Sequence, residues 1–413
     1  MWAQIRANKI RSVILVAALA GVLVLLGYFL GEAFLGSGIF GLIIALVIWL
    51  VMNLIAYFQG GALILALSGA KKIGPEDHPR LWNVVEEMKI ASGLEKMPEV
   101  YIIDDPAMNA FATGRSPRHA AVTVTSGLLQ RLNRDELQGV VAHEISHIQN
   151  RDVLLMTMCS VLLGTIVILA WYGSRVMLFS GSGGGRRSGS GGGGNAGAII
   201  LIVALLLAIL APIFAQLIYF AISRKREYLA DASGALYSRY PEGLASALEK
   251  IADSTVQLKS ANQAFAPMYI SNPFRKKGMS ASDLTSTHPP IRERIRILRG
   301  MGGGASFADY NKAFQQVRNK KQNIIPGAAI AGASAAGGAG LVSARQPEPA
   351  PDRFSESQQK VERTREVTAT LEKLNKYTAL ACQCGTAFRI PPDYKGRVIR
   401  CPRCGRDNQI PNR

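Results

Sequence analysis

The chain has 413 residues, of which 48% are hydrophobic and only 18% are charged, and its formal net charge is +18 at pH 7. The apolar residues come in long blocks, which indicates a membrane protein and argues against a disordered chain or an ordinary soluble domain. The basic residues lie beside these blocks and in the last third, as expected for cytoplasmic loops and for contact with anionic lipid. Nucleic-acid binding is the alternative explanation of the charge, and we do not expect it.

Two apolar stretches near the N-terminus, at 13–30 and 39–58, predict a transmembrane hairpin within residues 1–70. Both are long enough to cross a bilayer, and the second begins soon after the first ends, which argues against a cleaved signal peptide. The turn between them carries no Lys or Arg, whereas the N-terminus is basic, so we expect the N-terminus in the cytoplasm. Residues 61–70 either extend the second span or lie at the membrane interface.

Residues 71–151 are soluble in character and form the first part of a predicted domain. Short apolar, β-branched runs predict strands at 99–104 and 119–125. Asn133 stands three residues before Glu136, a spacing typical of a helix N-cap with a capping box. The helix that begins here carries the sequence His-Glu-Ile-Ser-His.

The chain contains only five His, and two of them, His143 and His147, are one helical turn apart with Glu144 between them. Positions i and i+4 lie on one face of a helix, so the two imidazoles can bind one zinc ion. Glu144 is then placed to act as a general base toward water. This spacing predicts a catalytic Zn²⁺, whereas His78 and His119 are expected at the surface.

A second transmembrane hairpin is expected within residues 152–222, with spans at about 153–172 and 198–222. A Gly/Ser-rich outer loop at 180–197 joins the two spans. Because two crossings return the chain to the side from which it started, the helices that flank this hairpin can close around one metal ion at the membrane surface.

A catalytic zinc ion needs a third protein ligand, and Glu227 is the best candidate. Asp231 lies four residues further on, on the same helical face, where its carboxylate could accept a hydrogen bond from a ligand His. The residues alone leave open the alternative that Glu227 pairs with Arg224 or Lys225 on a solvated face.

The remainder of the chain divides by composition into four segments. Residues 223–316 are soluble in character and mainly helical. Residues 317–360 are expected to be a linker, and its Ala/Gly-rich part at 324–344 has weak membrane contact as the alternative. A charged helix is expected at 361–378, and a Cys-rich segment occupies 379–413.

The Cys-rich segment holds two close Cys pairs separated by 16 residues. Its four cysteines are Cys382, Cys384, Cys401 and Cys404. Such pairs are typical of a tetrahedral zinc ribbon, so we expect a second, structural Zn²⁺. The ribbon is basic but has few aromatic residues, so we expect it to bind a protein partner or the membrane surface rather than nucleic acid.

Four motifs together carry a resemblance to a known family. They are NAFATG at 109–114, VVAHEISHIQNRD at 140–152, REYLADASGA at 226–235 and STHPPIRERI at 286–295. In this order, interleaved with the expected spans, they resemble the HtpX-type membrane zinc metalloproteases, relatives of the prenyl-protein (CAAX) endoproteases. The resemblance covers about residues 1–300. With the ribbon added, it implies a mainly α membrane protein with four transmembrane helices, a zincin-like α+β metalloprotease domain and a small C-terminal zinc ribbon.

The resemblance also implies roles for the metal-site residues. It implies His143, His147 and Glu227 as ligands of the catalytic zinc, Glu144 as the general base and Asp231 as the carboxylate behind a ligand His. These roles describe hydrolysis of a peptide bond by water.

Further residues match the parts of the family that contact the substrate. Asn109, Ala110 and Phe111 match a segment beside the substrate-binding edge strand, for which residues 119–125 are our candidate. His288 and Arg294 match positions that stabilise the developing oxyanion. Two other arginines of the same expected helix, Arg292 and Arg296, are the alternatives to Arg294.

We therefore predict a multi-pass zinc endopeptidase of the cytoplasmic (inner) membrane, with its catalytic domain and both termini in the cytoplasm. Its expected partners are the lipid bilayer and protein substrates, chiefly misfolded or damaged membrane proteins. Two alternatives remain at this point: a prenyl-protein-type endoprotease of narrow specificity, and a non-catalytic membrane adaptor that recruits partners through the ribbon. Substrate identity belongs to the family analogy alone.

Overall fold

The structure is a computed structural model of the whole chain. It describes residues 2–180, 224–259, 268–271, 289–319, 323–325 and 353–410, and eight isolated positions, which are 202, 206, 209, 210, 213, 327, 344 and 345. Most of the expected span at 198–222, most of the loop at 180–197 and most of the Ala/Gly-rich stretch at 324–344 lie outside the described residues.

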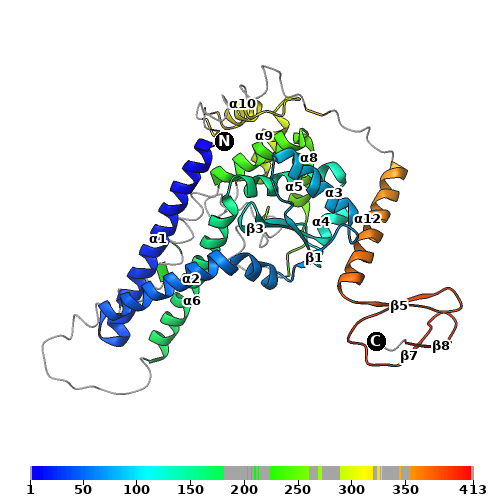
Figure 1. Ribbon diagram of the computed structural model, residues 1–413, viewed down its shortest axis with the longest axis horizontal. Helices are drawn as coiled ribbons and strands as arrows, with labels where there is room; N and C mark the ends of the chain where they lie inside the picture. The colour runs from blue at the N-terminus through cyan, green and yellow to red at the C-terminus, as the bar shows by residue number, and fades with distance from the viewer. Residues whose placement is uncertain are drawn as a thin grey trace.

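Three long helices pack against one another on one side of the molecule (Figure 1). They are α1 (Trp2–Leu35), α2 (Gly38–Leu67) and α6 (Asp152–Ser180). Among the described residues, α2 is the helix that is long and apolar enough to cross a membrane. Large apolar side chains on α2 are open to the outside, for example Ile39 at 71% and Phe58 at 59% exposure. Such exposure suits lipid contact and would be costly in water.

Small residues allow α1 and α2 to pack backbone against backbone. A Cβ atom added to Gly31 would lie 2.4 Å from the Cα of Gly41, and one added to Gly27 would lie 2.3 Å from the Cβ of Ala45. Gly27 and Gly31 are spaced by four residues on one face of α1, the pattern that lets membrane helices approach closely. Buried Leu19, Leu23 and Leu26 of α1 then pack with Leu155 and Ile166 of α6.

The domain that follows α2 is built on a four-stranded sheet. Its strands are β1 (Lys71–Ile73), β2 (Glu99–Ile103), β3 (Ala110–Ser116) and β4 (His119–Thr125), in the order β1-β2-β4-β3. β2 and β4 run parallel, and the other two pairs are antiparallel. The expectation that residues 119–125 form the edge strand was wrong, because β4 lies between β2 and β3. The edge strands are β1 and β3, and β3 contains most of the NAFATG motif.

Helices cover the sheet and enclose one core (Figure 1). They are α3 (Pro79–Ser92), α4 (Ser126–Arg131), α5 (Arg134–Gln149), α8 (Pro241–Asp253), α9 (Ile291–Arg299) and α10 (Phe307–Arg318). A further helix occupies 224–238. In Figure 1, α3, α5, α8 and α9 gather on one side of the sheet, and α2 and α6 extend from the other. The observed strands at 99–103 and 119–125 and the helix that begins after Asn133 match the sequence expectations.

His78 departs from the sequence expectation. It is fully buried, and its Nδ1 accepts the backbone N–H of Leu81 at 3.2 Å, so it caps the N-terminus of α3. An imidazole is an uncommon cap, which is why the sequence did not indicate one. His119 is exposed, as expected.

A shared apolar cluster joins the membrane helices to the domain. Ile64 near the end of α2 and Met156 near the start of α6 are buried together with Phe111 of β3 and Tyr269. The rings of Phe111 and Tyr269 meet edge to face, with centroids 5.2 Å apart. The sheet is therefore held directly against the two helices that leave it.

The C-terminal part begins with α12 (Arg353–Leu374), which is the expected charged helix, although it begins eight residues before 361 and ends four before 378. After it come two short hairpins that form the ribbon. Their strands are β5 (Thr378–Ala381) with β6 (Ala387–Ile390) and β7 (Val398–Arg400) with β8 (Asp407–Gln409).

Candidate metal centres

The helix that carries the first site, α5, has a well-defined start. Asn133 Oδ1 accepts the N–H of Glu136 and Glu136 Oε2 accepts the N–H of Asn133, both at 2.9 Å, so the predicted capping box is present. This cap fixes the rotation of the helix at its first turn. His143 and His147 then lie on one face, with their ring centroids 4.9 Å apart and their ring planes at 90°.

The chain turns sharply between α5 and α6. Arg151 has φ +59°, in the left-handed region, and Asp152 begins α6 directly afterwards. A non-Gly residue in this region costs energy unless the surroundings favour it. Here the turn brings Asp152 Oδ2 to 3.3 Å from Nδ1 of His147, inside the protein.

The third ligand comes from the helix at 224–238, which lies against α5. A Cβ atom on Gly234 would sit 3.2 Å from the backbone N of His143, so a side chain here would push the two helices apart. The close approach places Glu227 opposite both imidazoles. Its Oε2 is 3.7 Å from Nε2 of His143, and its Oε1 is 3.4 Å from Nε2 of His147.

These three residues fit a zinc ion. Bonds of 2.0–2.1 Å from zinc to nitrogen or oxygen in a tetrahedral arrangement place the ligand atoms about 3.4 Å from one another. The observed separations of 3.4 and 3.7 Å are close to that value. The three ligands are at most 4% exposed, and Nε2 of His143 is buried without a hydrogen-bond partner in the described part of the chain. A buried lone pair of this kind is satisfied by a metal ion.

Each imidazole is held from behind by a carboxylate. Nδ1 of His143 lies 3.0 Å from Oδ1 of Asp231, and Nδ1 of His147 lies 3.3 Å from Asp152. An N–H at Nδ1 leaves the lone pair on Nε2, which is the atom that faces Glu227. The structure therefore places Asp231 where the sequence predicted it, behind His143.

Arg294 is buried beneath this arrangement with only 1% of its surface exposed. Its Nε and Nη2 donate to the two oxygens of Asp231 at 2.8 and 2.7 Å. Its Nη1 lies 3.4 Å from Oε2 of Glu227. Arg292 and Arg296 of the same helix are exposed, so among these three arginines Arg294 is the one that reaches the site.

The site carries an excess of negative charge. Glu144, Asp152, Glu227 and Asp231 are buried there with two guanidiniums, which belong to Arg226 and Arg294. Four carboxylates and two guanidiniums leave a formal charge of −2 when both imidazoles are neutral, as they are when they bind a metal ion. A divalent cation balances this charge, which is a second observation that fits zinc.

The pKa values of two groups at the site, His147 and Asp231, also indicate that the site favours positive charge. Burial alone would lower the pKa of His147, but Asp152 and Glu227 outweigh burial and raise that pKa to about 10. Burial would raise the pKa of Asp231, but Arg294 and His143 hold it below its ordinary value. The carboxylate of Asp231 thus stays ionised and favours positive charge at the adjacent His143 and at a metal ion bound to it.

Asn109, Ala110 and Phe111 are connected to the site through the segment 268–271. The N–H of Ile270 donates to the carbonyl of Ala110 at 2.9 Å, and the side chain of Asn109 donates to the carbonyl of Ser271 at 3.0 Å. Nη1 of Arg294 in turn lies 3.4 Å from the carbonyl oxygen of Ile270. The first residues of the edge strand β3 are therefore linked to the metal centre.

The sequence did not indicate every residue of the site. Asp152 and Arg226, which lie 3.6 Å apart, each belong to one of the four motifs, but the sequence indicated a role for neither. An acidic residue one position after a helix break, beside a ligand His, is the signal that could have indicated Asp152. Segment 268–271 has no distinctive composition. His288 lies outside the described residues.

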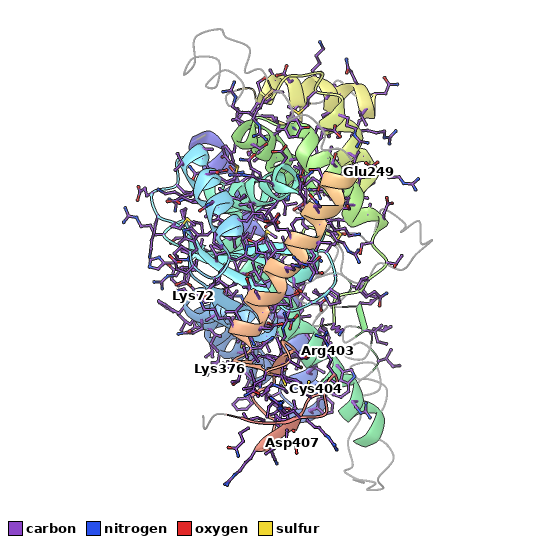
Figure 2. The ribbon with its side chains drawn as sticks, turned by 90° about the vertical axis from the view of Figure 1, so that its right-hand side faces the viewer. Lys72, Glu249, Lys376, Arg403, Cys404 and Asp407 are labelled. Atoms are coloured by element: carbon purple, nitrogen blue, oxygen red, sulfur yellow. The ribbon has the colours of Figure 1, made fainter. Side chains whose placement is uncertain are left out.

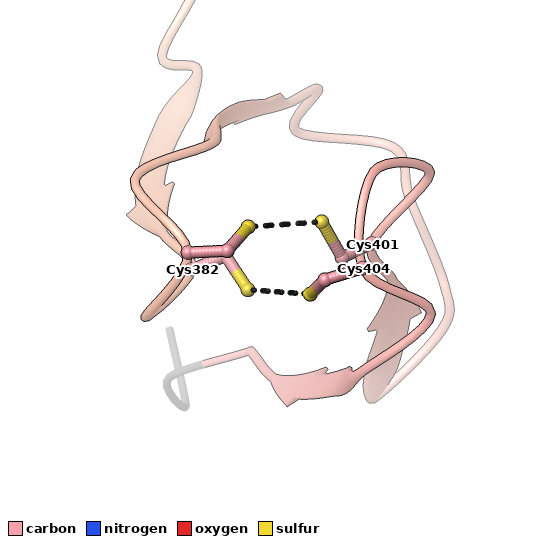
Figure 3. A group of neighbouring side chains, drawn as sticks. Cys382, Cys401 and Cys404 are labelled. Carbon is pink, nitrogen blue, oxygen red and sulfur yellow. Dashed lines mark hydrogen bonds between the residues drawn. The ribbon is translucent and has the colours of Figure 1, made fainter.

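The second centre is formed by the four ribbon cysteines (Figure 3). Sγ of Cys382 lies 3.6 Å from Sγ of Cys404, and Sγ of Cys384 lies 3.6 Å from Sγ of Cys401. Zinc–sulfur bonds of 2.3 Å in a tetrahedron require about 3.8 Å between sulfur atoms, whereas a disulfide requires about 2.05 Å. These separations fit a zinc ion held by four thiolates.

Two tight turns set the cysteine positions. Gly385 and Gly405 have φ values of +84° and +72°, which only glycine adopts readily. In each turn the glycine N–H donates to the carbonyl of the first cysteine, Cys382 or Cys401, at 2.9 Å. The hydrogen bond spans three residues in the C-x-C turn and four in the C-x-x-C turn, so the longer spacing of the second pair is taken up by a longer turn.

Comparison with known proteins identifies relatives of most of the chain. A family model described as peptidase family M48 matches residues 75–302. A protease HtpX homolog of Dictyoglomus turgidum is 48% identical over 265 residues, which cover 64% of this chain and 83% of that protein. A protease HtpX homolog of Lactobacillus helveticus is 42% identical over 301 residues, which cover 73% of this chain and all of the relative.

Among solved structures, the crystal structure of Ste24p of S. mikatae is similar with a TM-score of 0.38 and 21% sequence identity. The similarity covers 72% of this chain and 67% of that one. The M48 match ends before α10, so α12 and the ribbon lie beyond it.

Proposed function

Since this chain belongs to peptidase family M48 and is a membrane zinc protease of the HtpX type, we propose that it hydrolyses misfolded or damaged membrane proteins at the cytoplasmic face of the inner membrane. The observation that supports the chemistry is the convergence of His143, His147 and Glu227 at zinc-ligand separations, with Glu144 buried beside them. The observation that supports membrane substrates is the apolar cluster that joins the sheet to α2 and α6.

Zinc, when bound, polarises the scissile carbonyl group and makes water acidic enough to be deprotonated at neutral pH. Glu144 is the residue that accepts this proton, and it then delivers the proton to the leaving nitrogen. Asp231 and Asp152 hold the two imidazoles through their Nδ1 atoms and keep each Nε2 directed at Glu227. Glu144 acts on the reaction itself, whereas the two aspartates position the ligands.

Arg294 has a more constrained role than the family resemblance implies. Two of its donors are engaged by Asp231. We infer that Arg294 mainly positions Asp231 and Glu227. Its Nη1 already contacts Glu227 and the carbonyl of Ile270, so Nη1 would have to give up one of these contacts to face the developing oxyanion. His288, six residues earlier in the chain, is the other group proposed for that role.

Substrate binding is proposed at the start of the edge strand β3, at Asn109, Ala110 and Phe111. An extended peptide that pairs with this edge would lie beside the metal centre. The carbonyl of Ala110 already accepts the N–H of Ile270, so a substrate strand must displace the segment 268–271 or pair beyond it. This arrangement would favour unfolded chains, which can offer a free backbone.

The catalytic proposal is tested with wild type and Glu144→Gln purified in detergent. We expect close to two zinc ions per chain in both proteins, one for each centre, and cleavage of casein by wild type alone. Cleavage at the wild-type rate by Glu144→Gln would remove Glu144 as the base. One zinc ion per chain in both proteins would remove one of the two proposed metal sites.

The proposed topology has four spans, with the catalytic domain and both termini in the cytoplasm. It is tested with alkaline phosphatase fused either within the loop at 180–197 or after residue 413. Alkaline phosphatase is active only outside the cytoplasm, so we expect activity from the loop fusion and none from the C-terminal fusion. The reverse pattern would invert the topology, and equal activities would contradict a single crossing between the loop and the C-terminus.

A further inference from the structure

The ribbon is attached to the protease domain by a firmly docked helix. Val367 of α12 is fully buried in the core of the domain. The hydroxyl of Thr370 donates to the carbonyl of Asp77 at 2.7 Å, and Nζ of Lys373 lies 2.5 Å from Oδ1 of Asp77. α12 is therefore part of the folded domain, and its C-terminal end has a defined position.

That end lies where α2 leaves the membrane. The side chain of Asn375 accepts a hydrogen bond from Nζ of Lys71 and donates to Asp104 Oδ2 at 3.2 Å. Lys71 follows Leu67, the last residue of the membrane-spanning helix α2, by four residues, a chain length of at most about 14 Å. Figures 1 and 2 agree with this placement, since β5 begins beside β1 and Lys376 lies close to Lys72.

The ribbon itself is positively charged. Between residues 376 and 410 there are seven Lys and Arg and two Asp, a formal charge of +5. Four thiolates around one zinc ion contribute −2, which leaves +3. All seven basic side chains are exposed, and they are Lys376, Arg389, Lys395, Arg397, Arg400, Arg403 and Arg406.

Only some of these charges are used within the protein. Nη1 of Arg389 lies 2.5 Å from Glu372 of α12, which ties the ribbon to the helix. Lys395, Arg397 and Arg403 are exposed, and they have no carboxylate within ion-pair distance among the described residues. Figure 2 labels Arg403 in the ribbon next to Cys404.

Exposed amphipathic side chains stand among these charges. Tyr394 is 40% exposed and Val398 is 44% exposed, on either side of Arg397 in the chain. Tyr377, at the root of the ribbon, is 41% exposed. Tyrosines beside Lys and Arg are typical of surfaces that meet the headgroup layer of a bilayer, where the ring is in a partly apolar medium and the hydroxyl stays hydrated.

We propose that the ribbon docks on the bilayer surface next to α2 and binds the headgroups of anionic lipids through Lys395, Arg397 and Arg403. Three observations carry this inference: the root of the ribbon beside the membrane exit of α2, the net positive charge, and the exposed tyrosines. The bilayer is permanently within reach of the ribbon, so even weak attraction leads to docking, because the interaction is intramolecular in effect. This proposal goes beyond peptide-bond hydrolysis and does not depend on it.

The consequence of docking is a second anchor for the protease domain. The membrane helices attach the domain at α2 and α6, and the ribbon, through α12, would attach its other flank. Two anchors restrict how the domain tilts against the bilayer, and they would hold the metal centre at a constant height above the lipid.

Hydrogen–deuterium exchange of the full-length, zinc-loaded protein in nanodiscs tests the proposal. One set of nanodiscs contains phosphatidylcholine alone, and the other contains phosphatidylcholine mixed with phosphatidylglycerol. We expect slower exchange of the amides in 391–406 in the anionic nanodiscs, and loss of this protection when ionic strength is raised. Equal exchange in both nanodiscs would overturn the proposal, and so would the same protection in phosphatidylcholine alone on adding inorganic phosphate.

A charge-reversed variant identifies the residues responsible. Lys395→Glu, Arg397→Glu and Arg403→Glu together are expected to weaken docking by at least on the order of 100-fold and to abolish the lipid-dependent protection. The matched control reverses three exposed basic residues on α9 and α10, with Arg292→Glu, Arg296→Glu and Lys312→Glu, and is expected to keep that protection.

Two measurements show whether the ribbon variant is folded: its zinc content, and the hydrogen–deuterium exchange of the amides in β5 to β8 in phosphatidylcholine nanodiscs. If the folded ribbon variant keeps the protection, or the control loses it, these three residues do not form the lipid-binding surface.

Discussion

His147 and Glu227 stand 80 positions apart and meet at one metal centre only because two helices pack together, whereas Cys382 to Cys404 complete the other centre within one small unit. The ligands of the first centre are buried, and Asp152, Asp231 and Arg294 support them. The cysteines of the second centre stand on two glycine turns close to the surface.

The two centres differ in how far their folded structure depends on the metal ion. The ribbon has a small core, so a zinc ion bound there would contribute much of its folding free energy. The protease site is positioned by a large apolar core and by ion pairs, so its shape depends on the protein more than on the metal. Loss of zinc should therefore unfold the ribbon but only inactivate the protease domain.

Removal of the long-range ligand should have the largest effect on catalysis. Glu227→Ala is expected to lower casein cleavage by on the order of 1000-fold or more, because a catalytic zinc held by two imidazoles alone is bound too weakly. Zinc per chain should fall from about two to about one, since the ribbon keeps its ion. Two zinc ions in the variant would show that Glu227 is not a ligand, and Glu249→Ala, on an exposed face, is the control.

Substitution of the buried Arg294 should have the second largest effect on cleavage. Arg294→Met leaves Asp231 buried without its partner, which is expected to cost about 3–5 kcal/mol of unfolding free energy and to lower cleavage by roughly 100-fold. Thermal unfolding in detergent measures the first effect. Arg296→Met, two positions further along α9 and exposed, should leave both quantities near wild type. Equal behaviour of the two variants would contradict the positioning role of Arg294.

A smaller effect is expected from substitution of Asp152, the carboxylate that lies behind His147. Asp152→Asn keeps the side-chain shape but loses the charge beside His147, so affinity for the catalytic zinc should fall about 10- to 100-fold. Titration of the metal-free protein with zinc, followed by cleavage, measures this change. The exposed Asp253→Asn is the control, and an unchanged zinc affinity in Asp152→Asn would mean that His147 does not need this contact.

The smallest effect on cleavage is expected from the ribbon. Cys401→Ser should lose the second zinc ion and raise hydrogen exchange throughout 378–410, while cleavage of a soluble substrate stays within about twofold of wild type. The ion pair and hydrogen bonds of α12 to the domain do not involve the cysteines, so α12 should remain docked. A large fall in casein cleavage would show that the two centres are coupled.

Much of the fold was predictable where local patterns carry the information. The capping box at Asn133, the strands at 99–103 and 119–125 and the charged helix follow from short-range preferences. The order of the strands did not follow, because β3 and β4 have similar composition and strand pairing is a long-range choice. The burial of His78 depends on Glu366, nearly three hundred positions away, whose Oε1 lies 3.3 Å from the ring.

The sequence by itself determined the chemistry of both metal centres. The spacing of His143 and His147 on a helix and the two cysteine pairs are local patterns, and local geometry converts them directly into ligand positions. The tertiary structure decided what surrounds those ligands: Asp152 behind His147, Arg294 beneath Asp231, and the ribbon beside Lys71. These contacts join elements that are distant in the chain, and only the packing of a shared core brings them within hydrogen-bond distance.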